Sequence, residues 1–128
     1  MKKISELDLS SFNTNNVTNM NNMFSGYENL SELDLSSFNT NNVINLGGIF
    51  CGCYNLSKLN LLSFNTNNVT NMSYMFCNCE NLLELDLSSF NTNNVINMKG
   101  MLDGCKNLNK IIINKLNLKK FKEEINIS

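Results

Sequence analysis

The stretch SSFNTNNVTNM, residues 10–20, is polar and rich in asparagine, yet it occurs four times in the chain. It returns with small changes from Ser36, Leu62 and Ser88, each time 26 residues further on. Self-similarity at a fixed period of this length indicates a repeat protein, in which each unit buries its apolar face only against its neighbours. The sequence therefore predicts a stack of similar coils, in one domain and without a linker.

Apolar residues stay in register through the whole chain when it is written in rows of 26. One column consists of Leu7, Leu33, Leu59, Leu85 and Ile111, and a second of Phe12, Phe38, Phe64, Phe90 and Leu116. A disordered tract would not preserve such columns. We expect a single repeat domain over residues 1–128, with coils that start near residues 7, 33, 59 and 85 and a degenerate, charged C-terminal cap over 111–128.

Each unit predicts a strand and a segment that closes the coil. Leu33 and Leu35 alternate with polar residues, which is typical of a strand with one buried face, and the pattern LxxLxLxx is that of leucine-rich repeats. Val17, Met20 and Phe24 recur at helical spacing, which favours a short helix or 3₁₀ segment. The predicted fold class is thus an α/β repeat, a leucine-rich-repeat solenoid with one parallel strand per 26-residue coil and a short helix or 3₁₀ segment that closes each coil.

An asparagine follows each phenylalanine of the second column. Coils stacked about 4.8 Å apart would bring these amides into register, and each amide can both donate and accept a hydrogen bond. We therefore predict an asparagine ladder beside a phenylalanine spine. Its members are Asn13, Asn39, Asn65, Asn91 and Asn117.

Composition and charge exclude several classes of function. The net charge of −1 gives no reason to expect a nucleic-acid partner. No run of about 18 apolar residues is present, so we expect no membrane insertion, and the start MKKISELDLS is not a secretory signal. The chain has no histidine, the commonest general base. We therefore expect no enzyme, no catalytic residues and no cofactor.

The five cysteines cannot all be paired within the chain, because their number is odd. Cys51 and Cys77 share one column of the repeat, and Cys53, Cys79 and Cys105 share another. We favour unpaired thiols, with the second column in the core. Two alternatives remain open at this point: a disulfide between neighbouring coils, and a zinc ion held by the four cysteines of the second and third coils.

The solvent face of the strands is the candidate binding surface, which we call the strand face. It is largely acidic, but Lys58 interrupts the charges and Leu62 stands where the other coils have serine. An apolar side chain among charges is a feature that a protein partner can use. Alternatively, Lys58 only relieves repulsion between like charges on adjacent strands. The candidate partner-binding residues are Glu32, Asp34, Lys58, Asn60, Leu62, Glu84 and Asp86.

The first coil presents an unpaired strand edge over residues 7–12, beside Val17 and Met20. An uncapped apolar edge is a template for pairing with another chain. We therefore expect self-association through the N-terminal coil, which a lysine at Leu9 would reduce, or a longer array of which this chain is the C-terminal part.

The unit LDLSSFNTNNVTNMxxMFxxCxNL resembles the BspA-like leucine-rich repeats of bacterial surface proteins, including the 26-residue Mycoplasma-type domain of unknown function. The likeness runs from Leu7 to about Lys110 and rests on the LDLS strand, the Phe-Asn-Thr turn, the Val-x-x-Met-x-x-Met-Phe run and the Cys-x-Asn-Leu return. It implies a cell-surface or secreted solenoid that acts in adhesion or protein binding, with host and extracellular proteins as candidate partners. It implies no catalytic residues.

Three alternatives stand beside this interpretation. One is a structural spacer, or a fragment of a longer array, without binding of its own, and another is a cysteine-based metal or redox protein. The third concerns location: without a secretory signal, the chain would be cytoplasmic.

Overall fold

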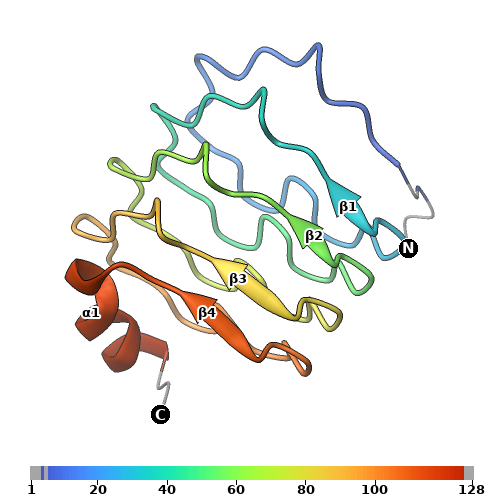
Figure 1. Cartoon of the computed structure of the whole chain (residues 1–128). Helices are drawn as coiled ribbons and strands as arrows, with labels where there is room; N and C mark the ends of the chain where they lie inside the picture. Colours follow the sequence, from blue (N-terminus) through green and yellow to red (C-terminus); the bar gives the residue numbers. More distant parts are fainter. Residues whose placement is uncertain (1–3, 5, 126–128) are drawn as a thin grey trace.

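The computed structural model describes residue 4 and residues 6–125. Residues 1–3, 5 and 126–128, which include the last three positions of the expected cap, lie outside the described residues. Figure 1 shows coils stacked one on another, with the strands side by side on one face and a helix at the C-terminal end. The elements are β1 (Glu32–Leu33), β2 (Lys58–Leu59), β3 (Glu84–Asp86), β4 (Lys110–Ile112) and α1 (Lys115–Ile125).

The strands pair in parallel at the offset that the repeat predicts. Glu32 lies opposite Lys58 in the pair β1–β2, and Leu85 lies opposite Ile111 in the pair β3–β4. Each pair is a separate two-stranded sheet, and no strand occurs in the described part of the first coil. The 26-residue register is confirmed, whereas the prediction of one strand in every coil is wrong for the first coil.

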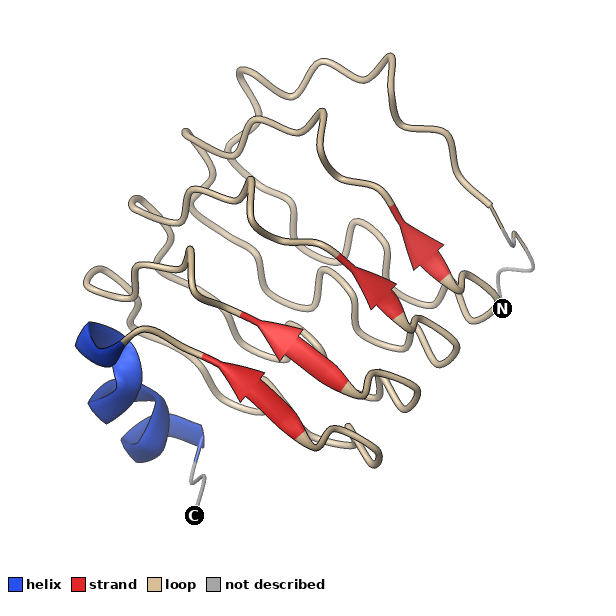
Figure 2. Ribbon diagram, viewed as in Figure 1, coloured by secondary structure: helices blue, strands red, loops and turns tan. Residues whose placement is uncertain are grey.

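An aspartate side chain closes a turn at the end of β1 and at the end of β3. Oδ1 of Asp34 accepts a hydrogen bond of 3.0 Å from the backbone N–H of Ser36, and Asp86 does the same for Ser88 at 2.9 Å. Such a contact two residues along the chain turns the backbone and competes with pairing to the next strand. Most of each coil is therefore turn and loop, as Figure 2 shows.

A second parallel ladder ties the coils together on the side opposite the strands. Asn19, Asn45, Asn71 and Asn97 form bridges from coil to coil. The N–H of Met20 donates to the carbonyl of Asn45 at 2.9 Å, and every second residue up to Gly26 continues in the same way. This ladder is longer than the strand pairs and holds the closing segments in register.

The predicted short helix or 3₁₀ segment in each coil is wrong for the described residues, where α1 is the helix that the structure contains. Consecutive turns take its place, as in the bonds from Met23 N–H to the Met20 carbonyl and from Ser25 N–H to the Asn22 carbonyl. Alternate N–H groups point to the next coil, so they are not available for bonds along a helix axis. Asn22, with φ of 59°, lies in the left-handed region that such turns use.

The buried apolar residues form one cluster that runs through the stack. Its centre is a column of stacked rings, in which the centroids of Phe24 and Phe50 are 6.0 Å apart and those of Phe50 and Phe76 are 5.6 Å apart. The predicted spine is buried at its three inner positions, but Phe12 is 52% exposed and Leu116 is 91% exposed. The two ends of that column thus do not belong to the core.

A buried threonine column organises the turn after the spine. The Thr14 hydroxyl accepts the backbone N–H of Asn39 at 2.8 Å and donates to the Asn39 carbonyl at 3.1 Å. The same reciprocal pair links Thr40 to Asn65. Because both backbone groups of the asparagine are satisfied by one side chain, the threonine is what joins neighbouring coils at this turn.

The predicted asparagine ladder forms differently. Asn39 Nδ2 donates to Oδ1 of Asn15 at 3.2 Å and not to Asn13, because Oδ1 of Asn13 already accepts the N–H of Asn15. The inner coils repeat this diagonal contact, for example between Asn65 and Asn41. The direct in-register ladder is therefore wrong. The amide oxygens of its first four members close their own turns, and that of Asn117 accepts from Thr92.

Candidate functional site

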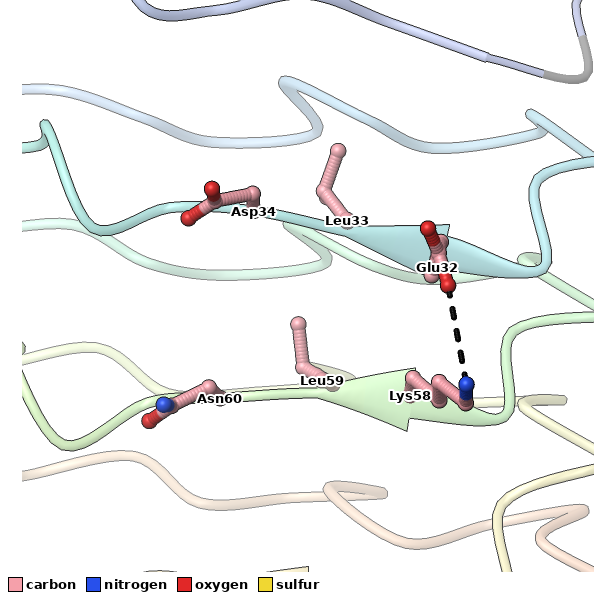
Figure 3. Close-up of a pocket in the computed structure, with 6 residues that line it drawn as sticks. All are labelled: Glu32, Leu33, Asp34, Lys58, Leu59 and Asn60. Carbon is pink, nitrogen blue, oxygen red and sulfur yellow. Dashed lines mark ion pairs between the residues drawn. The ribbon is translucent and has the colours of Figure 1, made fainter.

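The strand face carries an open hollow between β1 and β2, drawn in Figure 3. Lys58 Nζ lies 3.9 Å from Glu32 Oε2, and both side chains are largely exposed. An exposed pair of this kind contributes between about 0 and 1 kcal/mol, since water screens it and the long side chains lose freedom. The lining residues are Glu32, Leu33, Asp34, Lys58, Leu59 and Asn60.

Asn60 repeats the turn geometry of the aspartates without their charge. Its Oδ1 accepts the backbone N–H of Leu62 at 2.9 Å, as Asp34 and Asp86 do in their own coils. The position therefore requires an acceptor oxygen and does not require a carboxylate. Sequence reasoning took these residues only as surface groups, although the spacing of Asp or Asn two residues before the turn is a signal that could have found their structural role.

The aspartates of this face have lowered pKa values. The side-chain hydroxyl of Ser36, followed by its backbone N–H, holds the pKa of Asp34 below its ordinary value. Ser88 has the same effect on the pKa of Asp86, and Ser10 on that of Asp8. The negative charge at these positions is therefore fixed at neutral pH, whereas the third coil has none there.

Leu62 is exposed, as the sequence indicates, with 56% of its surface open to solvent. It borders a second hollow, which shares Asp34 and Asn60 with the first. Five of the candidate residues thus come together over the second and third coils. Glu84 and Asp86 line neither of these two hollows; they lie on β3, opposite Lys110 and Ile112 of β4.

None of the five cysteines is in a disulfide. The second-column thiols are hydrogen-bonded to the preceding coil: Cys79 Sγ donates to the Phe50 carbonyl at 3.2 Å, and Cys105 Sγ to the Phe76 carbonyl at 3.1 Å. Burial raises the pKa of the Cys79 thiol far above its ordinary value. In the described part of the chain no group of three or more His, Cys, Asp or Glu residues is placed to hold a metal ion, so the zinc alternative is not supported.

The N-terminal coil differs from the predicted strand edge. Leu9 is only 5% exposed and Met20 only 1%, so both belong to the core. A lysine at Leu9 would therefore disrupt the coil and would not test its edge. Phe12 is the large apolar side chain that this coil leaves open, and Val17 is half-buried.

A protein family described as "Mycoplasma protein of unknown function, DUF285" matches residues 1–124. The chain belongs to this family. No curated protein matches the DUF285 chain. Between residues 6 and 125, no helix is both long and apolar enough to cross a bilayer.

The crystal structure of a leucine rich cell surface protein from Faecalibacterium prausnitzii A2-165 is similar in fold, with a TM-score of 0.50 at 18% identity. The likeness covers 73% of the DUF285 chain and 24% of the other chain, so the match spans about a quarter of that protein. At this identity the comparison concerns the fold alone.

Proposed function

We propose that this DUF285 chain is a non-enzymatic leucine-rich-repeat solenoid segment of a surface protein, which binds a protein partner on its strand face. The observation that carries the proposal is the position of Leu62. It is exposed and lines the second hollow, in the coil whose outward residues depart from the otherwise repeated acidic pattern. A variable patch on a repeated scaffold is where a repeat protein distinguishes one partner from another.

The chemistry of the face favours a particular kind of partner. Asp34 lines the same hollow as Leu62, and Glu32 and Lys58 line the neighbouring hollow, which shares Asp34 and Asn60 with it. A matching surface presents an apolar anchor to Leu62 and basic side chains to the carboxylates, because complementary charge sets orientation and specificity. We infer an extracellular protein with an apolar residue among lysines or arginines. The surface location is suggested by the similar cell-surface protein.

The spacer function is the second candidate, and one observation favours it. The ion pair of Lys58 and Glu32 is long and exposed, as expected if Lys58 only relieves repulsion between neighbouring strands. In that case the strand face has no partner, and adhesion belongs elsewhere in a longer protein.

A binding experiment with a matched control separates the two candidates. The double variant Lys58→Glu, Leu62→Ser restores the pattern of the second coil and keeps the Asn60 turn. Ile96→Ser removes an exposed apolar side chain from outside the two hollows. Binding of the three chains to a panel of purified extracellular-matrix and serum proteins is measured by surface plasmon resonance, after circular dichroism has shown that all three fold alike.

For any panel protein that binds the wild type, we expect the double variant to bind at least about tenfold more weakly, as for loss of one hot-spot side chain, and Ile96→Ser to bind as the wild type. Equal affinity of the double variant and the wild type contradicts the strand-face proposal. Absence of binding across the panel supports the spacer.

A further inference from the structure

We propose that Cys51 and Cys77 form a surface dithiol site, which a low-molecular-weight disulfide oxidises reversibly to a cross-link between the second and third coils. The site lies outside the strand face and is independent of the binding proposed above. The site reacts with small disulfides.

The backbone ladder places the two cysteines at neighbouring positions. They are 26 residues apart, and the bonds from Phe50 N–H to the Met75 carbonyl (3.0 Å) and from Gly52 N–H to the Cys77 carbonyl (2.8 Å) flank Cys51 on both sides. Residues in register on parallel chains are about 4.8 Å apart, which lies within the range of Cα separations that a disulfide bridges. No coil has to move for the bond to form.

The two side chains are neighbours. Both residues are partly exposed, and the nearby Cys51 thiol helps to raise the pKa of Cys77. The column is restricted to this one pair, because the first coil carries Ser25 and the fourth coil Asp103 at the same position. Two thiols in register on neighbouring coils, partly open to solvent and without further cysteines in the column, can give one product.

The second column supplies an internal control. Cys79 and Cys105 have the same spacing of 26 residues, yet each thiol donates to a phenylalanine carbonyl of the preceding coil. Cys79 is also buried, so a small disulfide cannot reach its sulfur. Sequence spacing alone would make the two pairs equivalent, whereas the carbonyl contacts of Cys79 and Cys105 and the burial of Cys79 favour the first pair.

The oxidation balances as two thiol–disulfide exchanges. One protein thiol loses its proton to solvent, and its thiolate attacks a sulfur of the small disulfide, which releases one small thiol and leaves a mixed disulfide. The second protein thiolate attacks the protein sulfur of that mixed disulfide and releases the second small thiol. The protein loses two protons and two electrons, and the small disulfide is reduced to two thiols.

Proton affinity controls the rate of this exchange. Burial, followed by the neighbouring Cys51, Asp103 and Cys105, raises the pKa of Cys77 to about 11. Because only the thiolate reacts, the Cys77 thiolate fraction and the rate of any step that requires it increase about tenfold per pH unit below that value. We expect slow oxidation at neutral pH and faster oxidation in mild base.

The test uses the full chain, reduced and then incubated with oxidised glutathione at mildly alkaline pH. The number of free thiols should fall from five to three, the mass should fall by two hydrogens, and peptide mapping should find Cys51 joined to Cys77. A reductant should restore all five thiols. Cys51→Ser and Cys77→Ser should each abolish the cross-link, whereas Cys105→Ser should keep it.

Serine is the natural residue of the first coil at this position, so the serine variants are expected to fold, and circular dichroism checks this. Three results overturn the proposal: a cross-link between Cys79 and Cys105, a stable mixed disulfide with glutathione in the wild type, or five remaining thiols under conditions that oxidise dithiothreitol.

Discussion

The first coil and the third coil contain nearly the same phrase, yet they bury it differently. Phe12 and Phe64 both follow a serine and precede Asn-Thr, but Phe12 is 52% exposed and Phe64 only 2%. The difference comes from neighbours, because the third coil is covered by a coil on each side. Burial in a repeat array is a property of the stack and cannot be assigned to one unit alone.

The fourth coil is covered in another way. Asn117 at the start of α1 is buried, and its Oδ1 accepts both the N–H of Thr92, at 3.2 Å, and the Thr92 hydroxyl, at 2.8 Å. Lys120 Nζ donates to the carbonyls of Thr92 and Val95, and Phe121 is fully buried. Side chains of a helix thus replace the backbone that the next coil would have supplied.

The largest effect is expected from truncation of the two phenylalanines. Phe64→Ala should lower the free energy of unfolding by about 3–5 kcal/mol, because it opens a cavity in a packed core, whereas Phe12→Ala should cost about 1 kcal/mol or less. Urea unfolding followed by circular dichroism measures both. Ser63→Ala serves as the control and should cost little, because its contact to the Leu35 carbonyl is long, at 3.4 Å. Similar losses of stability for Phe12→Ala and Phe64→Ala would contradict the conclusion that only Phe64 is packed in the core.

Oxidation of Cys51 and Cys77 should strengthen the inner stack. A disulfide that closes a loop of this size contributes about 3 kcal/mol by restricting the unfolded chain. The melting temperature of the oxidised protein should therefore exceed that of the reduced protein, and Cys51→Ser should remove the difference. An oxidised chain that melts at or below the reduced one would indicate that the bond strains the coils.

Loss of the Asn117 side chain should cost about 1–3 kcal/mol, since Asn117→Ala leaves buried donors of Thr92 and the Phe90 carbonyl without a partner. Asn13→Ala is the matched variant, because Asn13 is exposed and its amide oxygen closes only its own turn. We expect a smaller loss for Asn13 in the same urea experiment. A smaller loss for Asn117 would show that α1 does not cover the fourth coil as described.

The exposed ring of Phe12 should affect association more than stability. If the N-terminal coil self-associates, Phe12→Ser should reduce the mean mass seen by light scattering at high concentration and lower the melting temperature by only a few degrees. Leu9→Lys, in contrast, should unfold the coil, because Leu9 is buried. A wild-type chain that remains monomeric at every concentration would refute the self-association.

The smallest expected effect is on the stability of the fold at low pH. The pKa values of Asp34 and Asp86 are lowered in the folded chain, chiefly by the hydroxyls of Ser36 and Ser88, so the unfolded chain binds more protons as the pH falls below the ordinary value of 3.8. Stability from these groups is present above that pH and is lost below it. Asp34→Asn with Asp86→Asn, which copies Asn60, should flatten the acid limb of the unfolding curve. An unchanged acid limb would mean that the serine contacts do not contribute to the stability of the folded chain.

The sequence alone was sufficient to predict the register of the strands and which of their side chains face solvent. Leu33 and Leu59 pair as the 26-residue alignment predicts, and Leu62 is exposed as expected. The hydrogen-bond partners of the asparagine side chains and the backbone conformation of the closing segment could not be predicted from spacing. Both depend on whether a polar group bonds within its own coil or to the neighbouring coil. The apolar spacing of Val17, Met20 and Phe24 fits a helix and a run of turns equally well, and only the N–H groups that donate to the next coil decide between them.

The turn roles of Asp34 and Asn60 were missed for a related reason. A polar residue at the end of a strand is compatible with binding, with charge relief and with closing its own turn, and the sequence pattern alone does not separate these roles. Their shared contact to the second residue along the chain does separate them. Of the candidate site, Glu32, Lys58, Leu62 and Glu84 are the members whose side chains accept no such turn contact among the described hydrogen bonds.

The threonine column and the ladder behind it have a mechanical consequence. The side-chain bonds between coils join residues only 24 to 29 positions apart, so each coil is held by its immediate neighbours and by nothing more distant. A chain stretched between its ends should therefore yield one coil at a time. Each release would add about 90 Å of length, at roughly 3.5 Å per residue. A cross-link between Cys51 and Cys77 would withhold the length between them, so the redox state would set how far the stack extends under load.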